Sequence, residues 1–169
     1  IEAGISEPNE MAHLHTMIQP TIGIFTNIGD AHNQNFESFE QKVSEKMKLF
    51  SSVSSLIYCA DYTLIHTHAQ KLECKKYAWS TTGNGNIQVN MQHTDSDTTI
   101  ISIHQNGNKD LYTVPFIDSA SLENCIHCII AARILNAEKS LNTHIQNLPQ
   151  VEMRLEQKKG IHNCTVIND

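Results

Sequence analysis

The sequence contains few basic residues and no block of them. Its 12 lysines and arginines are outnumbered by 18 aspartates and glutamates, so the net charge is −6 with histidine neutral. Proteins that bind nucleic acid or membrane surfaces usually concentrate positive charge in one segment or on one face. The composition therefore argues against nucleic acid or a membrane surface as the main partner.

Long apolar runs are also missing. No segment approaches the roughly 20 apolar residues that a membrane-spanning helix needs, and the first residues show no signal-peptide pattern. We therefore expect no membrane insertion. Apolar residues make up 40% of the 169 residues, which is typical of a globular domain with a real core.

A disulfide framework and a phosphate loop are both absent from the sequence. The five cysteines form no disulfide framework, which predicts reduced thiols and a cytoplasmic location. Cys125, His127 and Cys128 stand close together, but neighbouring positions of one helix cannot all face one metal, so structural zinc is not favoured. Gly83-Asn84-Gly85 lacks the Gly-Lys-[Ser/Thr] ending of a loop that cradles nucleotide phosphates.

The first part of the sequence alternates helix and strand patterns. Apolar runs at 22–28 and 55–60 predict strands buried on both faces, and helical patterns at 36–50 and 61–75 follow them. An earlier helix is expected to begin near Pro8 with Ser6 as its cap. This order predicts an α/β fold of the P-loop type, with a mostly parallel sheet flanked by helices.

The middle of the sequence follows a different pattern. Residues 77–117 contain short alternating runs separated by turn signals at 83–85 and 106–108, which predicts an added antiparallel meander. A helix capped by Ser121 is expected over 121–136, followed by a short helix and two strands at 142–148, 151–157 and 162–167.

Polar side chains stand where the predicted parallel strands end. Glu2 would follow a first strand, and Asn27, Asp30 and His32 follow the second. Ligands of open parallel sheets collect at this edge, so a carboxylate and an imidazole there suit a hard metal or a nucleotide phosphate. The alternative is that Glu2 is a frayed end and His32 an ordinary loop residue.

Three more candidates lie further along the chain. Lys46 could pack back towards the same edge, or it could be solvated, as we expect for Lys42 and Lys48. Asn124 begins an apolar helix and could be only a local cap. Arg154, which shares a strand face with Glu156, could form a surface ion pair or contact a phosphate.

Four segments of the chain, in order, resemble the Mur ligases. They read "IEAGISEPNEMAHL", "GIFTNIGDAHNQNFESFEQKVSEKMKLF", "SLENCIHCIIAA" and "VEMRLEQKKGIHNCTVIND". These segments are most similar to those of the family members that add D-Ala-D-Ala, including a form that some bacteria fuse to an alanine racemase. The likeness is weakest over residues 77–117.

The resemblance implies a fragment of a larger enzyme of peptidoglycan precursor synthesis. Such ligases have three domains, and this chain matches the later part of the central ATPase domain, without its N-terminal part and without the flanking domains. In the family, ATP phosphorylates the carboxylate of a UDP-MurNAc-peptide, and the amine of D-Ala-D-Ala then attacks the acyl phosphate. The expected cofactors are ATP and Mg²⁺.

The resemblance also implies roles for individual residues. Glu2 and His32 would hold magnesium, and Lys46 matches a lysine that many members carbamylate to bind a second ion. The nucleotide contacts would come from Asn27, Asn124, Arg154 and Asp169, with Asn124 at the adenine, Arg154 at the phosphates and Asp169 at the ribose.

Two positions depart from the family pattern. Lys46 is followed by Met47-Lys48 in place of Gly-Glu, and His127 replaces a second Asn. The alternatives are a sister muramyl ligase, a folylpolyglutamate synthetase-like ligase, or a non-catalytic nucleotide-binding or interaction module. Without a phosphate loop, residues 1–169 alone are expected neither to bind ATP tightly nor to form product.

Overall fold

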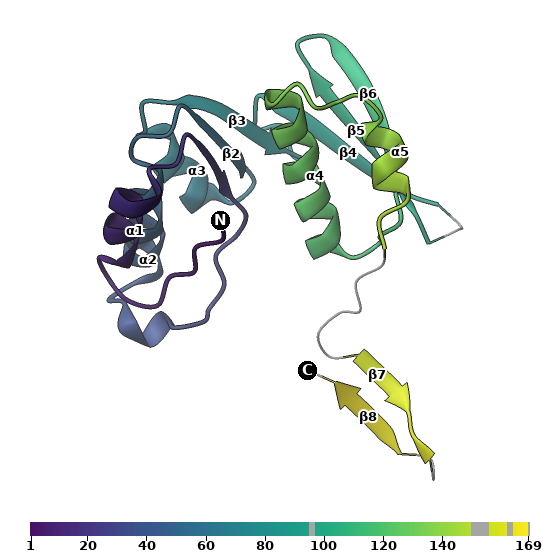
Figure 1. The fold of residues 1–169 in the computed structure, drawn as a ribbon, viewed down its shortest axis with the longest axis horizontal. Helices are drawn as coiled ribbons and strands as arrows, with labels where there is room; N and C mark the ends of the chain where they lie inside the picture. The colour runs from purple at the N-terminus through teal and green to yellow at the C-terminus, as the bar shows by residue number, and fades with distance from the viewer. Residues whose placement is uncertain (95–96, 150–155, 162–163, 169) are drawn as a thin grey trace.

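The computed structural model describes residues 1–94, 97–149, 156–161 and 164–168 (Figure 1). Two predicted site residues, Arg154 and Asp169, lie outside these ranges. Every helix in the described ranges is too short or too polar to cross a membrane.

A parallel half of the sheet forms the first part of the fold. Strands β1 (Ile22–Phe25), β2 (Ser55–Cys59) and β3 (Lys75–Ser80) pair in parallel and in that order. Helix α2 (Phe39–Met47), extended by a 3₁₀ turn at Lys48–Phe50, connects the first two strands, and α3 (Thr63–Gln70) connects the next two. This confirms the predicted α/β class with its parallel sheet.

Strand β2 shows why its apolar run forms the centre of the sheet. Leu56 and Tyr58 pack into an apolar cluster with α1, α2 and α3, whereas Ile57 and Cys59 pack into a second cluster with α4. Alternate side chains of a strand point to opposite faces, so both faces of β2 are covered. A nearly continuous apolar sequence is the result.

Helix α1 (Glu10–Ile18) begins later than predicted. The Glu10 carboxylate accepts the backbone N–H groups of Ser6 at 2.6 Å and Glu7 at 2.9 Å. These bonds hold the preceding residues in a turn outside the helix, and Asn9 takes a left-handed φ of 71° at the boundary. The prediction of Ser6 as cap and Pro8 in the first turn was therefore wrong.

The antiparallel meander is confirmed. Strands β4 (Ile87–His93), β5 (Thr99–Gln105) and β6 (Asn108–Val114) extend the sheet in the order β1-β2-β3-β4-β5-β6. The antiparallel pairing starts at β4, because β3 is still parallel to β2. Strands β3 and β4 overlap in only two parallel pairs, and residues 81–86 connect them.

Helix α4 (Ser119–Ile134) covers one face of the sheet beside α5 (Leu141–Gln146) (Figure 1). Its cap is Asp118, whose carboxylate accepts the backbone N–H of Ser121 at 2.8 Å, so the prediction of Ser121 as cap was wrong. Near the C-terminal end, β7 (Glu156–Lys159) and β8 (Thr165–Asn168) form a separate antiparallel pair.

Candidate functional site

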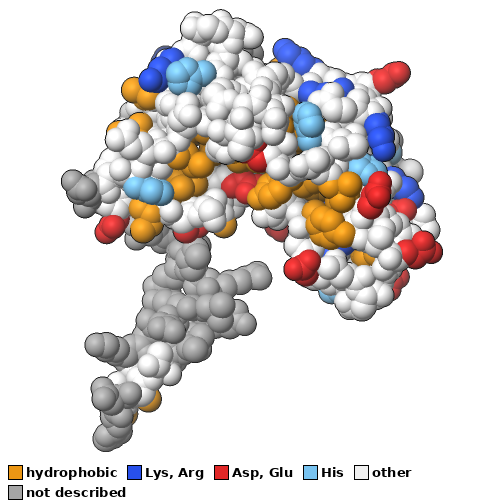
Figure 2. Space-filling view, turned by 180° about the vertical axis from the view of Figure 1, so that it is seen from behind, with side chains coloured by type: hydrophobic (Ala, Val, Ile, Leu, Met, Phe, Trp, Pro, Cys, Tyr) orange, Lys and Arg blue, Asp and Glu red, His pale blue; other side chains and the backbone are white. Residues whose placement is uncertain are grey.

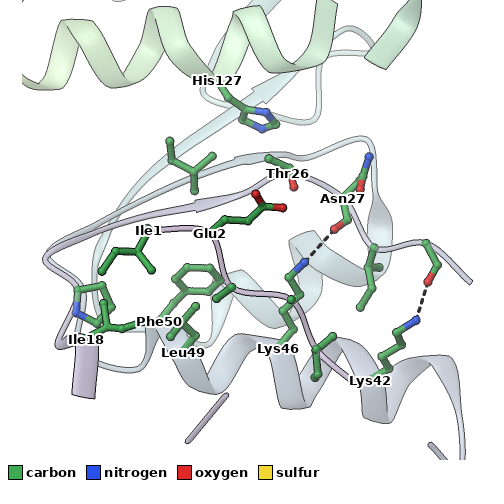
Figure 3. A pocket seen from close by; sticks show the side chains of 18 of the residues that line it. Ile1, Glu2, Ile18, Thr26, Asn27, Lys42, Lys46, Leu49, Phe50 and His127 are labelled. Carbon is green, nitrogen blue, oxygen red and sulfur yellow. Dashed lines mark hydrogen bonds between the residues drawn. The ribbon is translucent and has the colours of Figure 1, made fainter. Parts of the chain in front are cut away.

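A cavity of about 910 Å³ lies beside β1, the edge strand of the sheet, between α2 and α4 (Figure 3). Its lining includes Glu2, Asn27, His32, Lys46 and Asn124. These are all the residues to which the family resemblance gives a role within the described ranges, although they are up to 122 positions apart in sequence. The fold thus brings them around one space. Asp30, the other polar residue expected at this strand end, does not line the cavity. The space-filling view shows hydrophobic and acidic side chains in the hollow between the two halves of the molecule (Figure 2).

The segment that follows β1 forms one side of this cavity. His32 is exposed and has a left-handed backbone with φ of 61°, and a 3₁₀ turn follows it directly. The Asn35 amide donates to the Ser6 carbonyl at 2.9 Å, which ties this loop to the N-terminal segment. Residues 1–6 form neither helix nor strand, so Glu2 reaches the cavity from an irregular segment and not, as predicted, from a strand end.

Lys46 forms part of the floor. Its Nζ donates to the Asn27 carbonyl at 3.3 Å and lies 5.1 Å from the centroid of the Phe25 ring. Burial and the nearby Lys42 charge lower the pKa of Lys46, and the Glu2 carboxylate opposes them. Figure 3 shows the side chain reaching towards Asn27, below Glu2. This half-buried setting differs from the solvated position of the alternative interpretation.

Lys42 also lines the cavity, and the sequence interpretation missed it. Its residue is only 2% exposed, so the expectation of a solvated lysine was wrong. Lys48 is different, because it is partly exposed and pairs with Glu45 at 2.5 Å. A usable sequence signal existed, since Lys42 stands one helical turn before Lys46 and must share its face.

Helix α4 supplies the opposite wall. Asn124 is exposed to the cavity in the first part of the helix, and the capping role considered for it is filled by Asp118. His127, one turn later, is 2% exposed and packs edge-on against Trp79 with ring centroids 5.5 Å apart. Burial lowers the pKa of His127 to about 4, an effect that the Glu123 carbonyl partly opposes. The imidazole is therefore neutral near pH 7.

The metal-binding side chains at the cavity are few, and they suit an ion that takes further oxygen ligands from a bound phosphate and water. No group of three or more metal-binding side chains occurs in the part of the chain that the structure describes. The cavity does offer the carboxylate of Glu2 and the exposed imidazole of His32. Mg²⁺ is usually held by one or two protein carboxylates together with substrate phosphates and water, so these residues fit an ion bound jointly with a phosphate.

Comparison with known proteins shows which family the sequence matches. The Mur ligase middle domain model matches residues 1–132. A Bacillus subtilis relative, UDP-N-acetylmuramoyl-tripeptide–D-alanyl-D-alanine ligase, is 25% identical over 174 residues, covering 100% of this chain and 37% of the relative.

Solved structures show the same fold. MurF from Acinetobacter baumannii has a TM-score of 0.73 at 14% identity, covering 100% of this chain and 38% of that one. MurF from Thermotoga maritima in complex with ADP has a TM-score of 0.74 at 17% identity, covering 92% of this chain and 37% of that one. A point mutant of L. casei FPGS has a TM-score of 0.67 at 11% identity, covering 100% of this chain and 42% of that one. The chain thus spans well under half the length of these relatives.

Proposed function

Because the chain belongs to the Mur ligase middle-domain family, we propose that the cavity beside β1 is the nucleotide site of an ATP-dependent amide ligase. The observation that carries the proposal is the meeting of Glu2, His32, Lys46 and Asn124 around one space. A triphosphate and a carboxylate substrate repel each other, so a site that joins them needs cations and oxygen-binding groups together.

Each residue has a defined task in this proposal. Glu2 and His32 would hold Mg²⁺, which supplies Lewis-acid stabilisation of the transferring phosphoryl group. The Lys46 side chain faces the same space, either as an ammonium beside the phosphates or, after carbamylation, as an anionic metal ligand. Asn124 would hydrogen-bond the nucleobase from the α4 wall.

Three further assignments rest on the resemblance of the chain to its family. Asn27 would contact the nucleotide where β1 ends, Arg154 would bind its phosphates, and Asp169 would bind its ribose. An arginine fork suits phosphate oxygens because its donors are planar and fixed. Arg154 and Asp169 enter only as proposals from sequence.

The proposed reaction joins a carboxylic acid to an amine. The substrate carboxylate attacks the γ-phosphorus of ATP, giving an acyl phosphate and ADP, and the incoming amine then displaces phosphate to form the amide. The named relative from Bacillus subtilis supports a UDP-MurNAc-peptide as the acid and D-Ala-D-Ala as the amine. The likeness to FPGS keeps a different acid–amino-acid pair as the second candidate. With either substrate pair, we propose a cytoplasmic location.

Nucleotide binding by the full-length protein tests the site. We expect ADP to bind more tightly with Mg²⁺ than without it, and Asn124→Ala and Lys46→Met to weaken binding about tenfold each through loss of a polar contact. Lys71→Met is the matched control, since Lys71 is exposed at the end of α3 and does not line the cavity. The Lys71→Met protein should bind ADP as tightly as the wild type. Unchanged affinity for ADP in Asn124→Ala and Lys46→Met as well would contradict the assignment.

The reaction itself needs a separate assay. ADP release by the full-length protein should require both the UDP-MurNAc-peptide and D-Ala-D-Ala, and folate substrates should not replace them. Residues 1–169 alone should neither bind ATP tightly nor form product, because they contain no Gly-Lys-[Ser/Thr] loop for the β- and γ-phosphates. Ligation by this segment alone would contradict the second expectation.

A further inference from the structure

The ammonium of Lys42 is buried, and each of its three protons has an acceptor. Its Nζ lies 2.6 Å from the Gly29 carbonyl, 2.5 Å from the Ala31 carbonyl and 2.9 Å from the Asn33 side-chain oxygen. An ammonium has three donors and no acceptor, so its hydrogen-bonding capacity is used in full. All three acceptors belong to the loop between β1 and α2.

These acceptors lie on both sides of His32. The Ala31 carbonyl precedes it, the Asn33 side chain follows it, and one ammonium holds both. His32 itself has φ of 61°, a left-handed conformation that is unfavourable for a non-glycine residue and needs support from its surroundings. The bonds from Lys42 supply such a restraint from within α2.

Among the described residues, no carboxylate forms an ion pair with Lys42. The ion pairs found there join Lys48 to Glu45, His68 to Glu40 and Arg133 to Asp110. Buried charges are normally paired, because removal from water is costly. Lys42 is instead solvated by neutral oxygens, and it lines the same cavity as His32. An anion bound there would provide the missing opposite charge.

We propose that Lys42 is a positioning residue that fixes His32 at the rim of the cavity and leaves its own positive charge available to an anionic ligand. The part concerning the ligand rests on the proposed metal–nucleotide function, whereas the part concerning the loop does not. A purely structural role, in which Lys42 only adds stability to α2, makes different predictions.

Amide hydrogen exchange in the full-length protein tests the loop without any ligand. Lys42→Met keeps an unbranched apolar side chain, one atom shorter than lysine, and removes the three donors. We expect exchange at Asn33, Asn35 and Phe36, whose N–H groups bond within this loop, to accelerate at least about tenfold, with the sheet unchanged. Val43→Ala is the matched control, since Val43 is fully buried in the core and should affect the sheet more than the loop.

The milder Asn33→Ala removes one of the three acceptors and covers the case in which Lys42→Met fails to fold. It should accelerate exchange in the same loop by a smaller factor. Loop exchange that stays unchanged in Asn33→Ala and in any folded Lys42→Met protein, or that changes only in proportion to the sheet, would overturn the proposal.

Manganese tests the consequence for the site. With Mn²⁺ and ADP, the His32 imidazole resonances, assigned by their loss in His32→Gln, should broaden in the wild-type protein. Lys42→Met should need about tenfold more Mn²⁺ for the same broadening, and Val43→Ala and Lys71→Met should not. Equal broadening in Lys42→Met would overturn the role in the site. Absence of broadening in the wild type would instead contradict the proposed metal site, and faster loop exchange would still support the positioning of His32.

Discussion

The Ser80 hydroxyl donates to the Asp61 carboxylate at 2.5 Å and so joins the end of β3 to the end of β2. The same carboxylate accepts the backbone N–H of Thr81 at 2.8 Å and the Thr82 hydroxyl at 2.7 Å. Ser80 is fully buried and in turn accepts the N–H of Asn84 at 3.0 Å. These bonds shape the loop by which the parallel half of the sheet turns into the antiparallel half.

Replacement of Asp61 by Asn should destabilise the protein in a pH-dependent manner. The hydrogen bonds from Ser80, Thr81 and Thr82 outweigh partial burial and lower the pKa of Asp61 to about 2, below its ordinary 3.8. A lowered pKa of a carboxyl group stabilises the folded state above pH 4, and this stabilisation is lost as the pH falls towards 2.

We expect Asp61→Asn to cost about 1–2 kcal/mol at pH 7, after allowance for solvent screening at this partly exposed site. Urea unfolding of both proteins between pH 2 and pH 7 measures the difference. The difference in unfolding free energy between the two proteins should shrink steadily below pH 4. A difference that does not vary with pH would contradict a role for the Asp61 charge.

Alanine at Gly85 should be poorly tolerated. A Cβ built there would lie near the Ala78 carbonyl of β3, at separations far below van der Waals contact. The neighbouring Asn86 side chain accepts the Ala78 N–H at 2.9 Å and donates to the Lys76 carbonyl at 2.8 Å, so the loop cannot move away without loss of these bonds.

We expect Gly85→Ala to lower the free energy of unfolding by about 2–4 kcal/mol through backbone displacement. Gly4→Ala is the matched control, because a Cβ at Gly4 meets no atom within 4 Å and should change stability by less than about 0.5 kcal/mol. Thermal unfolding of the two variants gives the comparison, and similar losses would show that the close approach is not the cause.

His127 should make the protein sensitive to mild acid. In the folded protein the pKa of His127 is about 4, below the ordinary 6.5, so between pH 4 and pH 6.5 the imidazole is protonated in the unfolded chain but not in the folded one. The free energy of unfolding should therefore be highest above pH 6.5 and fall as the pH decreases towards 4.

His127→Leu should remove this component, which is on the order of 2–3 kcal/mol for a fully buried imidazole. Urea unfolding at pH 7 and pH 4.5 checks the prediction against the parent protein. His144→Leu is a control, since His144 lies on the exposed face of the short helix α5. A parent protein equally stable at both pH values would exclude the buried imidazole as an acid-sensitive group.

Local patterns in the sequence predicted most of the architecture. The apolar run of β2 and the alternating runs of β4 and β5 each correspond to a strand, because periodicity records which faces of a strand are buried. Helix starts were less certain. At α1 the Glu10 side chain bonds backward to residues before the helix, and at α4 the cap is Asp118 and not Ser121. Several polar residues near a helix start can cap it, and only the backbone path decides among them.

The candidate site was only partly predictable. Glu2, Asn27, His32, Lys46 and Asn124 could be named from strand ends and from the family likeness, but the sequence could not show that they surround one cavity. The burial of Lys42 was contrary to expectation, because lysine is almost always solvated. Its spacing from Lys46 indicates a shared helix face but not that the face is buried. The roles of Arg154 and Asp169 remain predictions from the sequence.

Patterns within short segments were enough to predict the α/β class, the change from parallel to antiparallel strands, and the family. The same patterns could not predict that α2 and α4 face each other across β1, that loop oxygens surround a buried Lys42, or that burial keeps His127 neutral. Those properties depend on distances between segments far apart in the chain, and only packing sets such distances.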